Sequence, residues 1–315
     1  MTATATAPAF ANANGIRLCY QTFGDSRNPP MVLIMGLAAQ MILWDDDFCT
    51  RLAERGFWVV RFDNRDIGLS TRFASARTPH LIEMLLRHAT GVRFGVPYTL
   101  RDMAADTVGL FDALGIRTAH VVGASMGGAI AQEIAIANPQ RLRSLTSIMS
   151  STGDPKLPGP EPRARERLGK KTPLDRDGYL REYVATWSVL SGDHFPFDAE
   201  RTMRQGLAGF ERGINPPGVA RQLMALIASG NRKNALSGVR VPTLVIHGTA
   251  DPLVPVQAGH DTARAIPGAQ LLLIEGMGHS FPREVWPRII DAIAGHASRA
   301  DAARTQPPRV NGETA

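Results

Sequence analysis

Short apolar runs alternate with amphipathic stretches along most of the chain. Met31 to Met35 is an uninterrupted apolar run and predicts a buried central strand, and Phe57 to Phe62 predicts another strand. Between them, Trp44, Phe48 and Leu52 recur every four residues, which gives a helix one apolar face. This alternation predicts an α/β fold, with a mostly parallel sheet covered by helices on both faces.

The alternation continues on both sides of this region. Ile16 to Phe23 predicts an edge strand, and Leu100 to Leu114 predicts a helix that ends at Gly115. Leu142 to Met149 predicts a further strand of the same sheet.

The pattern then breaks at Ser150 to Pro162, a segment rich in proline that cannot propagate a helix or a central strand. Asp177 to Ala235 is amphipathic in pieces and rich in aromatic residues, and strand-like sequence resumes at Val241. We therefore expect a core made of residues 15–150 and 236–296, and a helical lid made of residues 151–235. Residues 1–14 and 297–315 are expected to be disordered tails.

A candidate nucleophile lies on a sharp turn between a strand and a helix. The hexapeptide Gly123-Ala-Ser-Met-Gly-Gly128 follows the apolar run Ala119 to Val122 and leads into the helical stretch Ala129 to Ile136. The pattern G-x-S-x-G in this setting is typical of a nucleophile elbow, where small residues let neighbouring backbone pass close to a strained serine. Ser125 is the serine of this motif.

A nucleophilic serine needs a base and a group that orients the base, and both follow in the sequence. Asp251 comes just after the predicted strand Val241 to Gly248. His279 lies in a glycine-bearing loop after the next predicted strand, Gln270 to Ile274. Because ligands and reacting groups gather at the carboxyl ends of parallel strands, we expect these two side chains to meet Ser125 there.

From about Gly15 to His296 the sequence resembles the α/β-hydrolase superfamily. The resemblance is closer to bacterial esterases of the aclacinomycin methylesterase type and their lipase-like relatives. It rests on four segments: Leu33-Ile-Met-Gly36, Arg61 to Ser70, Gly123 to Gly128, and Gly276-Met-Gly-His279. The resemblance implies that the backbone N–H groups of Leu37 and Met126 form the oxyanion hole.

The expected chemistry is acyl transfer to Ser125, with His279 as general base and Asp251 orienting the imidazole. It requires neither a metal nor an organic cofactor. The substrate is expected to be a small to medium ester or a natural-product ester, including a macrocyclic or other lactone. Alternatives are a cofactor-free haloperoxidase or perhydrolase, an acyl-homoserine lactonase, and a non-enzymatic ligand receptor on the same scaffold; the complete set of three residues disfavours the receptor.

Several other residues have a candidate place near the site. Met41 and Trp44, just beyond the loop that holds Leu37, and the lid residue Trp187 are expected to line the substrate pocket. His247 ends a predicted buried strand, so we expect a hydrogen-bonding role in the core rather than catalysis. The stretch Asp63 to Ser70 is expected to stabilise a loop through internal hydrogen bonds and tight turns.

Composition adds constraints on partners. The 315 residues carry a formal net charge of +6, with lysine only at four positions (Lys156, Lys170, Lys171 and Lys233). The basic residues are scattered, so nucleic acid is not an expected partner, and the cluster Arg163 to Lys171 is expected to be a solvated face of the lid. Both a monomer and a homodimer are compatible with the sequence.

Cys19 and Cys49 are the only cysteines, and their apolar surroundings predict buried free thiols. The first residues lack the basic and apolar regions of a signal peptide, and no segment approaches the ~20 apolar residues of a membrane span. We therefore expect a cytoplasmic enzyme without integral membrane association.

Overall fold

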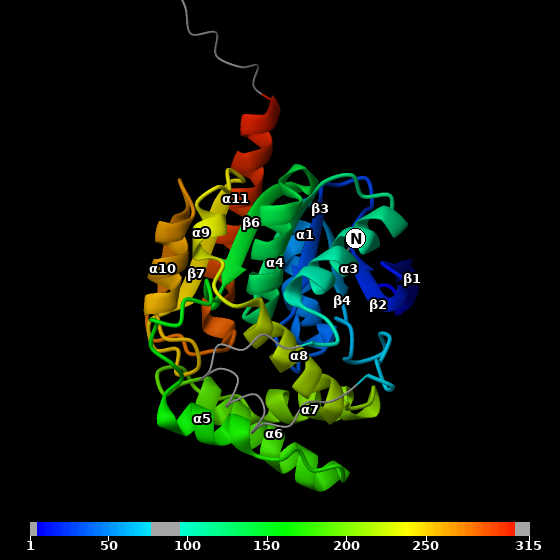
Figure 1. The fold of residues 1–315 in the computed structure, drawn as a ribbon, viewed down its shortest axis with the longest axis vertical. Helices are drawn as coiled ribbons and strands as arrows, with labels where there is room; N and C mark the ends of the chain where they lie inside the picture. The colour runs from blue at the N-terminus through cyan, green and yellow to red at the C-terminus, as the bar shows by residue number, and fades with distance from the viewer. Residues whose placement is uncertain (1–4, 77–94, 306–315) are drawn as a thin grey trace, which may run out of the picture.

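The computed structural model describes residues 5–76 and 95–305, which form an eight-stranded sheet with helices around it (Figure 1). The strand order is β1-β2-β4-β3-β5-β6-β7-β8; β1, β2 and β4 pair antiparallel, and all other neighbours pair parallel. The bounds are β1 Ala9–Ala13, β2 Ile16–Phe23, β3 Pro30–Ile34, β4 Trp58–Phe62, β5 Ala119–Ala124, β6 Leu142–Ile148, β7 Thr243–Gly248 and β8 Gln270–Ile274. The predicted fold class is confirmed.

Helices cover both faces of this sheet. The bounds are α1 Asp46–Glu54, α3 Leu100–Ala113, α4 Met126–Ala137, α10 Gln257–Ala265 and α11 Trp286–Thr305. Successive residues of β3 point to opposite faces: Val32 and Ile34 pack into one apolar cluster with α3 and α4, and Met31 and Leu33 pack into another with α1 and α11. Such a strand, buried on both sides, explains the uninterrupted apolar run in the sequence.

A helical insertion, residues 149–242, separates β6 from β7. It contains α5 Pro162–Gly169, α6 Arg176–Leu190, α7 Ala199–Glu211, α8 Pro216–Ser229 and α9 Lys233–Leu236. Figure 1 shows α5, α6 and α7 gathered at one end of the sheet, with α8 between them and the core helices. The predicted break in the strand–helix alternation therefore coincides with this insertion.

Two of the sequence expectations are wrong. The supposed tail 1–14 contains β1, which pairs with β2 along its whole length, so β2 is not the edge strand. Phe10 stabilises this pair by packing under the Arg17 guanidinium, 4.1 Å from the ring centre. The supposed tail 297–315 continues α11 as far as Thr305, because Ala297 and Ala300 are buried against the core. Residues 1–4 and 306–315 of these tails lie outside the described part of the chain.

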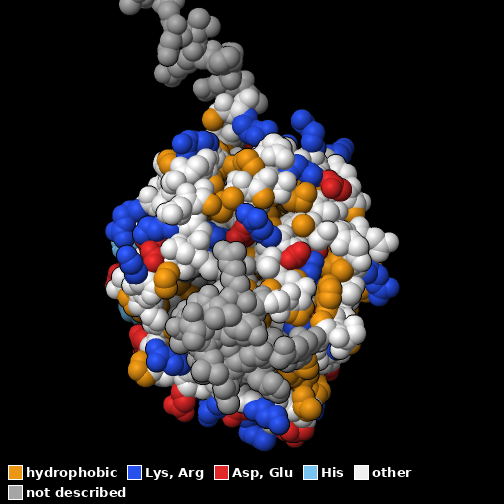
Figure 2. All heavy atoms as spheres, in the orientation of Figure 1, with side chains coloured by type: hydrophobic (Ala, Val, Ile, Leu, Met, Phe, Trp, Pro, Cys, Tyr) orange, Lys and Arg blue, Asp and Glu red, His pale blue; other side chains and the backbone are white. Residues whose placement is uncertain are grey.

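The charged surface agrees with the scatter seen in the sequence. The face drawn in Figure 2 carries basic side chains at several separate places, with acidic ones among them. In the cluster 163–171, Arg163 pairs with Glu161 and Asp193, and the cluster's residues are mostly exposed. No helix in the described ranges is long and apolar enough to span a bilayer.

Both cysteines are buried and free, as predicted. Burial raises the pKa of the Cys49 thiol to about 12, so this thiol stays protonated at neutral pH.

Candidate active site

Ser125 lies at the tight turn where β5 ends and α4 begins. Its backbone adopts φ 55° and ψ −121°, a conformation that residues with a Cβ rarely take. The turn is closely packed. A Cβ added to Gly123 would lie 2.1 Å from the carbonyl oxygen of Gly127, and a Cβ added to Gly127 would lie 2.1 Å from the carbonyl oxygen of Ile34. Only glycine fits at both positions, which accounts for the spacing of the motif around Ser125.

The structure brings the three sequence-predicted polar residues together. His279 Nε2 lies 3.0 Å from Ser125 Oγ, and His279 Nδ1 lies 2.7 Å from Asp251 Oδ2. Asp251 follows β7 and His279 follows β8, so both reach the carboxyl edge of the sheet where β5 ends in Ser125. An imidazole in this position can accept the hydroxyl proton while the carboxylate fixes the opposite ring nitrogen.

Backbone contacts hold this acid and base in place. Asp251 Oδ1 accepts hydrogen bonds from the N–H groups of Leu253 (2.9 Å) and Val254 (2.8 Å), which leaves Oδ2 for the histidine. The backbone N–H of His279 donates to the carbonyl of Leu190 at the end of α6, over 2.7 Å. The loop after β8 that holds His279, residues 275–282 and here called the histidine loop, is therefore attached directly to the insertion.

His247 has the core role expected from the sequence. It is fully buried, and its Nε2 lies 2.7 Å from the Val254 carbonyl oxygen. Burial lowers the pKa of His247, which favours the neutral ring. In the neutral ring, Nε2–H donates to the carbonyl of Val254. This hydrogen bond stabilises the turn whose N–H groups, those of Leu253 and Val254, donate to Asp251.

A cavity of about 550 Å³ opens above Ser125 and His279. Core and insertion both contribute to its mainly apolar wall, which includes Leu43, Met149, Leu168, Trp187, Phe195, Phe197, Val219, Leu223, Leu226, Leu253 and Phe281. A wall of this kind suits an apolar organic group of medium or large size.

Only one of the three expected pocket residues lines this cavity. Trp187 of α6 does, whereas Met41 and Trp44 are fully buried beside it and are not part of its wall. The Trp44 ring packs instead against Phe48 and Phe281, with centroids 5.7 Å and 5.3 Å apart. The expectation for Met41 and Trp44 is wrong because it rested on their nearness to Leu37 in the chain, and both residues precede α1 in a segment whose apolar side chains pack into the core.

The loop after β3, residues 35–41 and here called the β3 loop, forms one side of the site. Gly36 lies close to Ser125, since a Cβ added at Gly36 would lie 3.1 Å from Ser125 Cβ. Leu37 lines the cavity beside Ser125. Met126 is the first residue of α4, so its N–H is one of the N-terminal donors that have no acceptor within the helix. The role of these two N–H groups stays a prediction.

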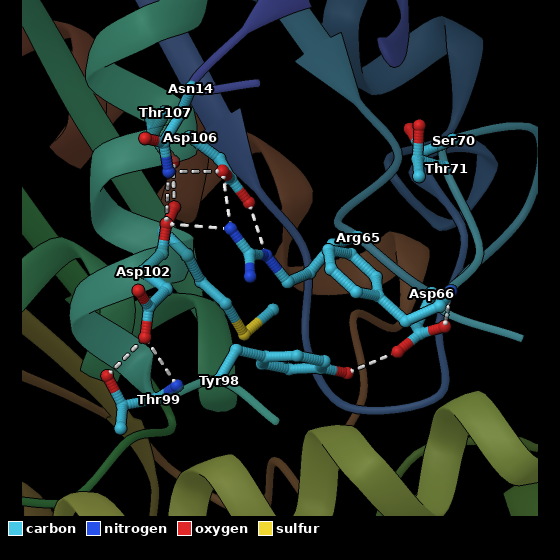
Figure 3. Close-up of polar contacts among 12 residues, drawn as sticks. Asn14, Arg65, Asp66, Ser70, Thr71, Tyr98, Thr99, Asp102, Asp106 and Thr107 are labelled. Carbon is cyan, nitrogen blue, oxygen red and sulfur yellow. Dashed lines mark hydrogen bonds and ion pairs between the residues drawn. The ribbon is translucent and has the colours of Figure 1, made fainter. Parts of the chain in front are cut away.

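The loop after β4, residues 63–73 and here called the β4 loop, is held by buried ion pairs, and Figure 3 shows the pair between Arg65 and Asp106. Asp63 accepts from the N–H of Leu69 (3.0 Å), which agrees with the predicted internal hydrogen bonding. Arg65 forms two hydrogen bonds with Asp106, of 2.6 Å and 2.7 Å.

Asp66 in the same loop has partners from distant parts of the chain. It accepts from the Tyr98 hydroxyl (2.7 Å) and twice from Arg221 of α8 (2.8 Å and 2.7 Å). Burial opposes ionisation of Asp66, but its hydrogen bonds, Arg221's first, hold its pKa below the usual value. Nothing in the sequence points to this contact apart from the acidic and basic residues of the β4 loop.

Within residues 5–76 and 95–305, no group of three or more His, Cys, Asp or Glu side chains is arranged to hold a metal ion.

Comparison with known proteins adds an independent result. Residues 29–282 match the alpha/beta hydrolase fold family. Rhodomycin D methylesterase DnrP of Streptomyces peucetius is 31% identical over 90% of this chain and 96% of that protein. Rhodomycin D methylesterase DauP of Streptomyces sp. (strain C5) is 29% identical over the same shares. The crystal structure of the enol-lactonase from Burkholderia xenovorans LB400 shares the fold, with a TM-score of 0.69 and 22% identity over 92% of this chain and 100% of that one.

Proposed function

The chain belongs to the α/β-hydrolase fold family as a hydrolase of the esterase type, and we propose that it cleaves carboxylic esters through an acyl-enzyme on Ser125. The observation that carries this proposal is the hydrogen-bonded chain from Asp251 through His279 to Ser125 at the wall of an apolar cavity. Nucleophile, base and orienting carboxylate lie in the order and geometry that acyl transfer needs.

In the proposed reaction, Ser125 Oγ attacks the ester carbonyl carbon while its proton moves to His279 Nε2. The tetrahedral intermediate collapses, and the leaving alkoxide takes that proton from His279 and departs as the alcohol. Water then attacks the acyl-enzyme by the same route, with His279 as the base, and releases the acid. Asp251 holds the ring orientation and stabilises its charged form.

The N–H groups of Leu37 and Met126 are proposed to bind the developing oxyanion. Both residues adjoin Ser125, one from the β3 loop and the other as the next residue in the chain. Loss of one such donor typically costs about 3 kcal/mol of transition-state stabilisation.

The apolar wall and the size of the cavity support an ester with a medium or bulky apolar acyl group. The two methylesterase relatives support a small alcohol, such as methanol, as the leaving group. Lactones are further candidate substrates, because ring opening uses the same nucleophile and base.

The test is hydrolysis of p-nitrophenyl esters from acetate to decanoate, together with aryl methyl esters, a macrocyclic lactone and an acyl-homoserine lactone. Wild type and Ser125→Ala are measured in parallel, with peracid formation from acetate and hydrogen peroxide as a further assay. Ester turnover that requires Ser125 is the expected result. Equal turnover by both proteins would refute the proposal, and peracid formation faster than ester hydrolysis would favour the perhydrolase alternative.

A further inference from the structure

Gln222 of α8 joins the insertion to both loops of the site. Its side chain is fully buried, and both ends of its amide are hydrogen-bonded. Oε1 accepts from the backbone N–H of Ala38 in the β3 loop over 3.2 Å. Nε2 donates to the carbonyl of Arg65 in the β4 loop over 2.8 Å. One side chain therefore links the insertion to the segment that follows Leu37.

The β3 loop needs such support because its backbone is strained. Ala38 adopts φ 62°, in the left-handed region that residues other than glycine rarely enter, and it is exposed toward the cavity. A conformation of this kind persists only where neighbouring groups fix it. Within the loop, the Ala39 N–H reaches the Gly36 carbonyl oxygen only at 3.4 Å, so the contact with Gln222 is the shorter of these two hydrogen bonds.

We propose that Gln222 is a positioning residue that holds the β3 loop in the shape in which the Leu37 N–H faces the oxyanion. The inference rests on the proposed function. The hydrogen bond from the Ala38 N–H to Gln222 Oε1 fixes the peptide plane between Leu37 and Ala38. This limits how far the N–H of Leu37 can turn. A donor held in advance at the site of developing charge lowers the barrier without any rearrangement during the reaction.

The position of Gln222 is itself well determined. Its neighbour Arg221 forms two hydrogen bonds with Asp66. Arg65, whose carbonyl accepts a hydrogen bond from the Gln222 amide, is held in turn by Asp106, as Figure 3 shows. The amide thus lies between a fixed helix and a fixed loop. Asn64 and Asp63 bind the two ends of the β3 loop, at Met35 and Met41, and Gln222 binds its middle at Ala38. On other positions of α8, Val219, Leu223 and Leu226 line the cavity, so this helix contacts the substrate space as well as the loop.

The test compares Gln222→Met with wild type on a p-nitrophenyl ester and on an alkyl trifluoromethyl ketone, which forms a tetrahedral adduct with a serine nucleophile. Methionine keeps the length and burial of the side chain and removes both hydrogen bonds. We expect kcat to fall by about 10- to 100-fold, with KM changed by about twofold or less, and the inhibition constant of the ketone to weaken in parallel with kcat.

Two further variants separate positioning from general stability. Ser144→Ala removes a buried hydrogen bond to His120 between β5 and β6, outside the Asp66 network, and is expected to lower the melting temperature while kcat and ketone affinity stay at wild-type values. Gln222→Glu keeps an acceptor for the Ala38 N–H, and, because full burial favours the protonated carboxyl group, it also keeps a hydroxyl donor for the Arg65 carbonyl; it is expected to recover most of the lost kcat. An unchanged kcat in a folded Gln222→Met protein, or an equal loss in the Met and Glu variants, would overturn the inference.

Hydrogen exchange of the wild-type protein provides a test that does not depend on how the variants fold. The Ala38 amide is expected to exchange slowly although its residue is exposed, because Gln222 holds its hydrogen. Fast exchange at Ala38 would refute the positioning role. Absence of ester turnover in the wild type would instead refute the proposed function, so the two failures are distinguishable.

Discussion

Backbone geometry around Ser125 decides which residues its neighbours can be. The carbonyl oxygen of Ile34 would lie 2.1 Å from a Cβ at residue 127, and the carbonyl oxygen of Gly127 would lie 2.1 Å from a Cβ at residue 123. These close approaches bring β3, β5 and α4 together next to Ser125. Small residues in the motif therefore have a steric cause that can be tested separately from catalysis.

Gly127→Ala is expected to destabilise the protein by about 1–3 kcal/mol and to displace Ser125, because the new methyl group overlaps the Ile34 carbonyl. Alanine ordinarily stabilises a helix position relative to glycine, so a loss of stability in Gly127→Ala would indicate the steric overlap. Gly169→Ala in α5 is the matched control, since no atom lies within 4 Å of its added Cβ. Urea unfolding and ester turnover measure both effects; equal stabilities of the two variants would contradict the steric account.

Asp251→Asn is expected to lower kcat by about 10⁴-fold with little change in KM, because an amide favours the wrong tautomer of His279. The substitution keeps the size of the side chain and its acceptor for the N–H groups of Leu253 and Val254. Circular dichroism should therefore show an intact fold. A kcat within tenfold of wild type would remove Asp251 from the mechanism.

His120 in β5 makes stability depend on pH. Burial lowers its pKa to about 4, even though Asp301 acts in the opposite direction. The folded state thus favours the neutral ring. The neutral His120 contributes about 3 kcal/mol to the free energy of unfolding; this contribution is complete above the unfolded pKa near 6.5 and is lost as the pH falls toward 4. Urea unfolding of wild type and His120→Gln between pH 7.5 and 4 should give a shallower pH dependence for the variant. Identical slopes would contradict this account.

At the residue scale, the sequence identified the candidate nucleophile, base and acid because each adjoins a strand end, and parallel strands bring such ends to one edge. It failed for Met41 and Trp44, whose apolar face meets the core instead of the cavity. Gln222 had no local signal, since its partners Ala38 and Arg65 are distant in sequence and only the fold brings them near.

Two elements differ from the sequence expectation for physical reasons. β1 is short and rich in alanine, so its sequence carries little strand signal, and backbone pairing with β2 places it in the sheet. The last part of α11 is rich in alanine and arginine, which favour helix, and its buried alanines allow close packing. In contrast, the apolar strands and the proline-rich entry to the insertion were visible in the sequence, because their patterns are long and continuous.

α6 contributes both to the cavity and to the histidine loop. Trp187 lines the cavity, and Leu190 near the end of the helix accepts the His279 N–H. Trp187→Ala is expected to raise KM for p-nitrophenyl decanoate by about tenfold, since a large apolar contact is lost, and to leave KM for the acetate nearly unchanged. The acetate is the internal control. An equal change for both esters would show that Trp187 does not contact the acyl chain.

For the whole molecule, the insertion and the core are joined by buried ion pairs as well as by apolar packing. Asp66 of the core and Arg221 of α8 are both nearly inaccessible, with side-chain exposures of 0% and 2%. Removing one partner of such a pair leaves an uncompensated buried charge. The attachment of the insertion therefore depends on a few polar contacts near the site.

Arg221→Met is expected to lower the free energy of unfolding by about 3–5 kcal/mol because Asp66 loses its charged partner. Arg204→Met is the matched control: its partner is Glu200, and both side chains are exposed, so the expected loss is below about 1 kcal/mol. Urea unfolding of both variants measures the difference. Similar losses in the two variants would contradict the importance of the buried pair.

In the proposed reaction, Ser125 carries the acyl group during ester hydrolysis. The most direct measurement follows inactivation by paraoxon, an organophosphate that forms a stable adduct with a nucleophilic serine, and maps the adduct by peptide mass spectrometry. We expect loss of p-nitrophenyl ester hydrolysis in proportion to one diethylphosphoryl group per chain, located on Ser125. Full activity after complete modification of Ser125, or inactivation with the adduct on another residue, would contradict the account.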